Sequence, residues 1–151
     1  MDKTIIRLDN IAKSFGNVRV IHHISFSIEA GKVYALAGEN GAGKSTAMKI
    51  LFGFYKADKG DILIHGKKVQ LNSPIEAMAA GIGMVHQHFM LAEPISALDN
   101  ILLNQPGRAF NTLPRAEEKK RLDNLAKQYG FDLDLNSKVE DLSVGAQQRL
   151  E

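Results

Sequence analysis

The sequence predicts an α/β fold in which a strand, a glycine-rich loop and a helix follow one another around residue 40. Residues 33–37 are apolar and have strand character, and the glycine-rich segment 38–45 follows them directly. Residues 46–52 are helix-forming and amphipathic, and Gly53 ends them. A loop that leads from a strand into a helix places the helix N-terminus against an anion. We therefore predict an α/β core with an anion site at this loop.

Further strands are predicted on both sides of the loop. Gly16 and Asn17 mark a turn between two runs rich in β-branched residues, which predicts antiparallel strands near the N-terminus. Gly66 separates two shorter runs that predict a hairpin. The four predicted strands cover residues 4–8, 18–28, 61–65 and 67–71.

A helix is predicted after the hairpin. Ser73 and Glu76 have the spacing of a capping box, and Pro74 stands at the first helical position. This helix is expected to stop at Gly81, after which residues 82–86 predict a buried strand.

The later part of the chain is mostly helical. A short helix is predicted over residues 95–103, and a longer one over residues 114–129 is ended by Gly130. The longer helix has an apolar face that consists of Leu122, Leu125, Ala126 and Tyr129. We therefore predict two regions, the first part of an α/β core at residues 1–88 and a helical subdomain at residues 89–151.

Composition and charge narrow the classes of function. Lys and Arg total 19 against 17 Asp and Glu, and a net charge of +2 does not favour a nucleic-acid partner. Cysteine is absent, which excludes disulfides and thiolate metal sites and fits a reducing compartment. Apolar runs stay well short of the roughly 18 to 20 residues that cross a bilayer, so a membrane role is expected to depend on a partner.

The glycine-rich segment matches the whole phosphate-binding pattern G-x-x-x-x-G-K-[ST]. Gly41 and Gly43 let the backbone approach a phosphate closely, Lys44 is expected to reach the outer phosphates, and the Ser45 hydroxyl is expected to coordinate Mg²⁺. A glycine-rich turn without a ligand is the alternative, but all four specified residues and the flanking elements agree with the pattern. The predicted nucleoside triphosphate site consists of Gly38, Glu39, Asn40, Gly41, Ala42, Gly43, Lys44, Ser45 and Thr46.

Residues 142–149, Leu-Ser-Val-Gly-Ala-Gln-Gln-Arg, resemble the signature motif of ABC-type ATPases, L-S-G-G-Q followed by Q-Q-R or a close variant. Val144 and Ala146 replace the usual Gly and Gln, whereas the phosphate-facing Ser143 and Gly145 are retained. An ordinary N-capped helix is the alternative, for which Ser143 would suffice. The resemblance implies contacts to the ATP of an opposite subunit from Ser143, Val144, Gly145 and Gln147.

Two more residues fit the order of the ABC family. Gln87 stands where the family places its Q-loop glutamine, which meets Mg²⁺ and the attacking water; the alternative is an ordinary loop glutamine. Phe15 stands where the family places an aromatic ring that stacks on adenine; the alternative is a core phenylalanine at a strand end.

Over nearly its whole length the chain thus resembles an ABC transporter ATP-binding subunit. This implies a P-loop NTPase of ABC type with ATP and Mg²⁺ as cofactors, whose hydrolysis of ATP drives solute uptake. The implied partners are transmembrane permease subunits, a second ATP-binding domain in a head-to-tail dimer and, indirectly, a solute-binding protein, at the cytoplasmic face of the cell membrane. Residues 84–91 and 147–151 look like the first ATP-binding half of double-domain proteins that serve simple-sugar and nucleoside importers.

The ABC pattern also includes an apolar strand ending in Asp-Glu and a later His, neither of which can be assigned. We therefore expect a fragment with an incomplete core sheet that binds ATP but turns it over weakly or not at all. Residues 89–113 are expected to dock a membrane partner, or else form a variable loop. Two alternative functions remain: a soluble ABC-type ATPase acting on ribosomes or DNA, and a non-catalytic nucleotide-binding fragment.

Overall fold

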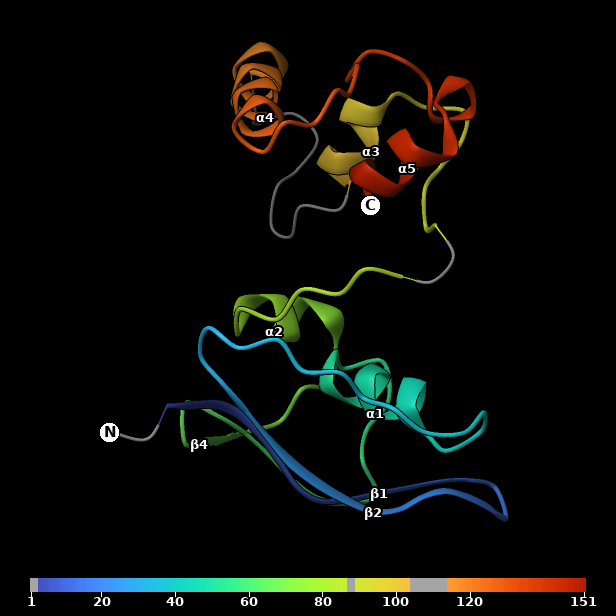
Figure 1. Cartoon of the computed structure of the whole chain (residues 1–151). Helices are drawn as coiled ribbons and strands as arrows, with labels where there is room; N and C mark the ends of the chain where they lie inside the picture. Colours follow the sequence, from blue (N-terminus) through green and yellow to red (C-terminus); the bar gives the residue numbers. More distant parts are fainter. Residues whose placement is uncertain (1–2, 87–88, 104–113) are drawn as a thin grey trace. The chain divides into compact units, whose positions relative to one another are not determined.

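The computed structural model describes residues 3–86, 89–103 and 114–151 of the chain. Two compact units divide the chain, unit 1 at Met1–Met84 and unit 2 at Val85–Glu151. Figure 1 shows the helices and strands of both units. Each unit has a hydrophobic core of its own.

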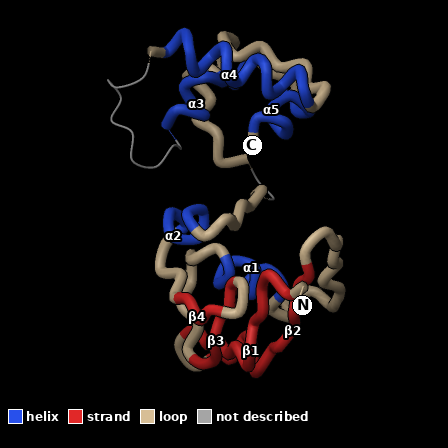
Figure 2. The backbone as a smooth tube through the Cα atoms, turned by 90° about the vertical axis from the view of Figure 1, so that its left-hand side faces the viewer, coloured by secondary structure: helices blue, strands red, loops and turns tan. Residues whose placement is uncertain are grey.

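Unit 1 contains a four-stranded antiparallel sheet with the strand order β2-β1-β3-β4 (Figure 2). The strands are β1 (Thr4–Phe15), β2 (Val18–Glu29), β3 (Lys59–Ile64) and β4 (Lys67–Val69). The predicted strand pair near the N-terminus and the predicted hairpin around Gly66 are confirmed, although β1 is longer than its sequence pattern indicated.

The strand β1 continues past a bulge at Asn10. The register of β1 shifts across this residue in its pairing with β2 and in its pairing with β3. Asn10 has φ 51°, and its N–H donates to the Ser25 hydroxyl at 2.8 Å. Side chains of a regular strand alternate between faces, so residues three apart point to opposite sides. The extra residue at the bulge corrects this offset and leaves Leu8 and Ile11 both fully buried.

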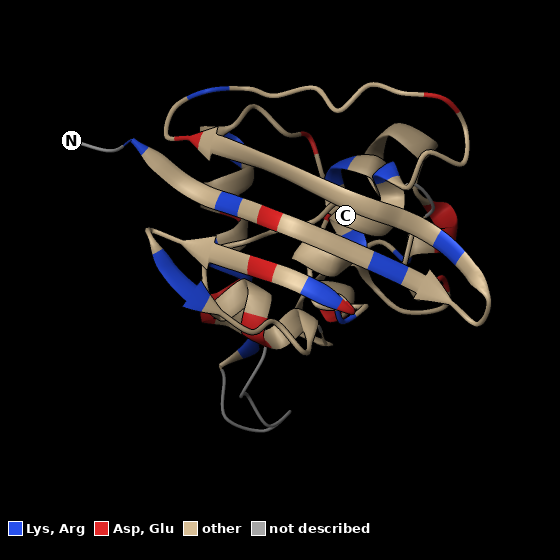
Figure 3. Ribbon diagram, turned by 90° about the horizontal axis from the view of Figure 1, so that it is seen from below, with Lys and Arg blue, Asp and Glu red and all other residues tan. Residues whose placement is uncertain are grey.

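Two helices cover one face of the sheet, α1 (Lys44–Leu51) and α2 (Pro74–Ala79) (Figures 1 and 2). The core between helices and sheet includes Leu8, Ile11, Ile21, Ile50 and Ile62. Figure 3 looks onto the other side of the sheet, where charged residues lie along the strands. Arg7 and Asp9 flank the buried Leu8 and form an ion pair at 3.6 Å.

The predicted capping box opens α2. The Ser73 hydroxyl accepts a hydrogen bond from the Glu76 N–H at 3.3 Å. The Glu76 carboxylate in turn accepts from the backbone N–H of Asn72 at 2.8 Å, one residue before the N-cap. The predicted helix start is therefore confirmed, with the carboxylate reaching one residue further than in the simplest capping box.

Two predicted strands are wrong. Within the described part of the chain, residues 33–37 and 82–86 are irregular, and Val33, Tyr34 and Val85 are exposed. An extended segment becomes a strand only when its backbone N–H and C=O groups form hydrogen bonds with a neighbouring strand. The sheet formed by the described residues consists of β1 to β4 and includes neither segment, so their apolar composition alone does not make them strands.

Unit 2 is helical. Its helices are α3 (Ala97–Leu103), α4 (Arg115–Gln128) and α5 (Val144–Leu150), with a 3₁₀ turn η1 (Val139–Asp141) before α5. The two helices predicted before Gly130 are confirmed. Leu98, Leu122 and Leu135 form most of a small core. Tyr129, which was predicted on the apolar face of the longer helix, is the C-cap of α4 and remains 65% exposed. Among the described residues, no helix combines the length and apolar character that a bilayer crossing requires.

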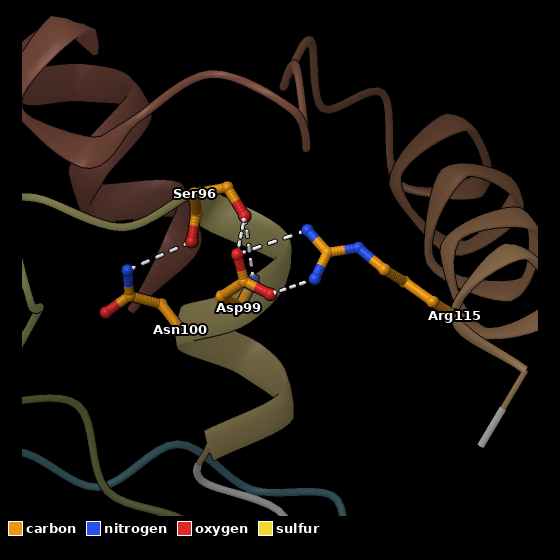
Figure 4. Close-up of polar contacts among 4 residues, drawn as sticks. All are labelled: Ser96, Asp99, Asn100 and Arg115. Atoms are coloured by element: carbon orange, nitrogen blue, oxygen red, sulfur yellow. Dashed lines mark hydrogen bonds and ion pairs between the residues drawn. The ribbon is translucent and has the colours of Figure 1, made fainter. Parts of the chain in front are cut away.

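Polar contacts join the first turns of α3 and α4 (Figure 4). The Asp99 carboxylate accepts from both guanidinium NH groups of Arg115, one of them at 3.1 Å, and from the Ser96 hydroxyl at 2.5 Å. Asn100, which is buried, accepts from the Ala92 N–H at 2.7 Å and donates to the Ala92 carbonyl at 3.0 Å. These contacts fix the chain that precedes α3 and tie α3 to α4.

The Asp99–Arg115 pair makes the stability of unit 2 dependent on pH. The hydrogen bond from Arg115, together with that from Ser96, holds the pKa of the Asp99 carboxyl below its usual value. Because the folded-state pKa is depressed, this contribution is complete above the unfolded pKa of about 3.9 and is lost as pH falls through the folded value. We expect Arg115→Gln to lower the free energy of unfolding of unit 2 by about 1 kcal/mol at pH 7.

The measurement is urea unfolding at a series of pH values. The difference between wild type and Arg115→Gln should shrink steadily as the pH falls below about 4. Lys119→Gln is the control, because Lys119 pairs with Asp123 within one helix, and i,i+4 helix pairs contribute about 0.3–0.5 kcal/mol. A difference that stays constant down to pH 2 would show that the ion pair is not its source.

Candidate phosphate-binding site

The candidate site begins with a loop whose backbone only glycine adopts easily. Gly41 has φ 84° and Gly43 has φ 85°, both in the left-handed region. The Ala42 N–H donates to the Glu39 carbonyl at 3.2 Å, which closes a turn inside the loop. The chain enters α1 directly at Lys44, with Gly43 as N-cap. The first N–H groups of this eight-residue helix have no carbonyl partner within the helix, and they lie where the loop ends.

The loop rests on the sheet through Gly43. A Cβ atom at this position would lie 2.9 Å from Ile21 Cγ1 and 3.0 Å from the Val20 carbonyl oxygen, both on β2. Ala47 and Ile50 on the inner face of α1 are buried in the core of unit 1. The loop is therefore held on one side by β2 and on the other by a buried helix.

The Lys44 side chain lies along the loop. Its ammonium donates to the carbonyl oxygens of Gly38 and Glu39, each at 2.7 Å. These contacts place a positive charge beside the glycines and beside the positive end of α1. Backbone N–H groups, a helix N-terminus and an ammonium together fit the oxygens of a polyphosphate.

A metal ion would have few ligands from this loop. Ser45 is exposed in the first turn of α1, so its hydroxyl can provide one oxygen. In the described stretches of the chain, no three His, Asp or Glu side chains group together as a metal site would require. This donor set fits Mg²⁺, which usually keeps several waters and is held largely by the phosphates that it accompanies.

Phe15 is the last residue of β1, and 41% of it is exposed. Its ring lies 5.0 Å from the Tyr55 ring at an interplanar angle of 74°, and the Lys13 ammonium lies 5.4 Å from its centroid. The ring is thus fixed by neighbours but keeps free surface. The sequence did not identify Tyr55, because this tyrosine belongs to another element and no motif includes it.

The signature segment lies at the start of α5 in unit 2. Ser143 is the N-cap, and its hydroxyl accepts from the Ala146 N–H at 3.2 Å. Gln147 donates its side-chain amide to the carbonyls of Val139 and Leu142, at 3.0 and 3.2 Å. Val144 is exposed, and a Cβ at Gly145 would approach only the flexible end of Arg149, at 3.6 Å. Gln87, the predicted Q-loop residue, lies outside the described residues.

The chain matches the family model described as "ABC transporter" over residues 21–151. This range includes the glycine-rich loop and the signature segment. Phe15 lies before it.

Similar curated proteins are ATP-binding proteins of importers. The chain is 40% identical over 147 residues to the guanosine import ATP-binding protein NupO of Bacillus subtilis, which covers 97% of this chain and 29% of that protein. It is 38% identical over 151 residues to the nucleoside import ATP-binding protein NupA of Lactococcus lactis, covering 99% and 30%. It is 40% identical over 148 residues to the ribose import ATP-binding protein RbsA of Caldanaerobacter subterraneus, covering 97% and 30%. The chain therefore spans about three tenths of the length of these relatives.

Solved structures with a similar fold are ATP-binding cassettes. CbiO1 of Clostridium perfringens, part of the ABC transporter complex cbiONQ, has a TM-score of 0.74 at 27% identity, over 99% of this chain and 59% of that one. A nucleotide-free ATP-binding cassette from an ABC transporter has a TM-score of 0.79 at 26% identity, over 97% and 62%. The fold described above, an antiparallel sheet with α1 and α2 and then a helical unit, is therefore part of the α/β fold of these cassettes.

Proposed function

This chain belongs to the ABC transporter family, and from that premise we propose that it binds ATP with Mg²⁺ at residues 38–46. The observation that carries the proposal is the loop at the N-terminus of α1, where Gly41 and Gly43 have positive φ and the Lys44 ammonium lies along the loop. The triphosphate oxygens would accept hydrogen bonds from the backbone N–H groups and from the ammonium. Mg²⁺ would be held by the Ser45 hydroxyl, the phosphates and Gln87, and Phe15 would stack on the adenine.

We propose that the whole protein hydrolyses ATP to drive import. The similar relatives are import ATP-binding proteins for guanosine, nucleosides and ribose, which supports a nucleoside or simple sugar as solute. The expected partners are permease subunits in the membrane, which would place the protein at the cytoplasmic face, with residues 89–113 as the docking surface. A solute-binding protein would act indirectly.

A second ATP-binding domain would complete the site. In this proposal the signature segment, with Ser143, Val144, Gly145 and Gln147, faces the γ-phosphate of ATP bound to the other domain. Ser143 and Val144 are the exposed residues among these four, so they would meet the opposite domain directly. Positioning an attacking water needs groups beyond the loop, and we expect weak turnover, or none, when the 151-residue chain is assayed alone.

The test of the proposed function is calorimetric titration of the chain with Mg-ATP, beside Lys44→Ala. We expect saturable binding that the substitution weakens at least about tenfold, because charge-assisted hydrogen bonds to phosphate are lost. Lys68→Ala is the matched control, since Lys68 lies on β4 and its ammonium pairs with Asp61. Equal affinity for wild type and Lys44→Ala would rule out the loop as the triphosphate site.

A further inference from the structure

We propose that Tyr55 and Asp58 are positioning residues that hold the Phe15 ring in place for base stacking and thereby set the preference of the site for a nucleotide over a bare triphosphate. This inference rests on the proposed function, since it concerns the base of the nucleotide bound at the loop. Neither residue belongs to the motifs that identify the family.

Tyr55 connects Phe15 to the loop helix. Its backbone N–H donates to the Lys49 carbonyl at 3.3 Å, just beyond the end of α1. Its ring packs against the core of unit 1 and meets the Phe15 ring at 5.0 Å. Aromatic pairs prefer such an edge-to-face arrangement, which restricts both rings. The helix that starts at the phosphate loop therefore also carries the residue that orients Phe15.

Asp58 fixes the backbone that carries Phe15. One carboxylate oxygen accepts from the Lys13 ammonium at 2.8 Å, and the other accepts from the Ser14 N–H at 2.7 Å. The Asp58 N–H donates to the Ala12 carbonyl at 2.9 Å. Three successive residues before Phe15 are thus bonded to one aspartate, and the bond from Lys13 holds the pKa of its carboxyl below the usual value.

Lys13 is placed by the same aspartate. Its side chain is only 15% exposed, and its ammonium lies over the Phe15 ring. A cation over an aromatic face is attracted to it, which further restricts the ring. A ring that is already restricted loses little side-chain entropy when a base stacks on it. The remaining exposed surface of Phe15 is then ready for the base.

The test compares Mg-ATP with inorganic tripolyphosphate as ligands, in wild type, Tyr55→Leu, Asp58→Ala and Tyr55→Phe. We expect Tyr55→Leu and Asp58→Ala to weaken ATP binding about three- to tenfold while tripolyphosphate affinity stays the same. Tyr55→Phe should keep the wild-type ratio of ATP affinity to tripolyphosphate affinity, since the contact between the rings is kept. Tyr129→Leu is the matched control, because Tyr129 is an exposed tyrosine of unit 2.

The possible results separate this inference from the proposed function. If Tyr55→Leu weakens the binding of both ligands equally, Tyr55 only supports the loop. If it leaves ATP affinity unchanged, Tyr55 does not position Phe15. Either result overturns the inference. Wild-type affinities that are equal for ATP and tripolyphosphate would overturn it and leave the phosphate site standing. Binding of neither ligand by folded wild-type protein would overturn both proposals.

Discussion

Replacing Gly60 with alanine is expected to lower the free energy of unfolding of unit 1 by about 3 kcal/mol or more. Gly60 has φ 89°, and a Cβ there would lie 2.4 Å from the Asp9 carbonyl oxygen and 2.5 Å from the carbonyl carbon and oxygen of Asn10. These are backbone atoms at the bulge of β1. Unlike the end of a flexible side chain, they cannot rotate away from the added methyl group. The methyl group would force β1 and β3 apart at the bulge.

The control for this prediction is Gly66→Ala, in the turn between β3 and β4. Gly66 has a similar φ of 74°, but a Cβ there meets nothing within 4 Å. Only the conformational strain remains, about 1–2 kcal/mol. Urea unfolding followed by circular dichroism, with amide exchange at Leu8 and Ile62 to report on unit 1, compares the two variants. Equal losses would show that the close approach of β1 to β3 is not what requires glycine at position 60.

Local signals in the sequence predicted the elements that depend on neighbouring residues. The Ser73–Glu76 spacing predicted the start of α2, and the glycines followed by Lys44 predicted a loop that leads into a helix, although α1 begins at Lys44, two residues earlier than expected. In these cases the partners of each hydrogen bond lie within a few residues of one another. The helices of unit 2 were predicted for the same reason, because helical bonds are local.

The wrong predictions concern contacts between distant segments. Residues 33–37 and 82–86 are apolar enough for strands, but a strand also needs a neighbour, which an apolar run does not specify. The bulge at Asn10 likewise depends on two partner strands at once. In the candidate site, the sequence singled out Phe15 from its place before the loop. It did not reveal that the Tyr55 ring contacts Phe15 or that Asp58 bonds to the residue before it, because nothing in the pattern joins these positions.

Replacing Gly43 with alanine is expected to weaken Mg-ATP binding by about a hundredfold while unit 1 stays folded. Gly43 has φ 85°, which costs alanine about 1–2 kcal/mol. The added Cβ would also lie 2.9 Å from Ile21 Cγ1 and 3.0 Å from the Val20 carbonyl oxygen. Ile21 is buried and Val20 contributes backbone, so neither yields easily. The loop must therefore leave β2, which moves Lys44 and the start of α1 away from the phosphates.

Gly41→Ala separates loop strain from this contact, because Gly41 has nearly the same φ, 84°, with nothing within 4 Å of its Cβ position. Strain alone should weaken Mg-ATP binding about tenfold, so the excess loss in Gly43→Ala measures the contact with β2. Calorimetry gives both affinities, and thermal unfolding shows whether unit 1 remains intact. If Gly41→Ala loses as much affinity as Gly43→Ala, the backbone angle alone controls the loop. If Gly43→Ala binds Mg-ATP with wild-type affinity, phosphate binding does not depend on the contact between the loop and β2.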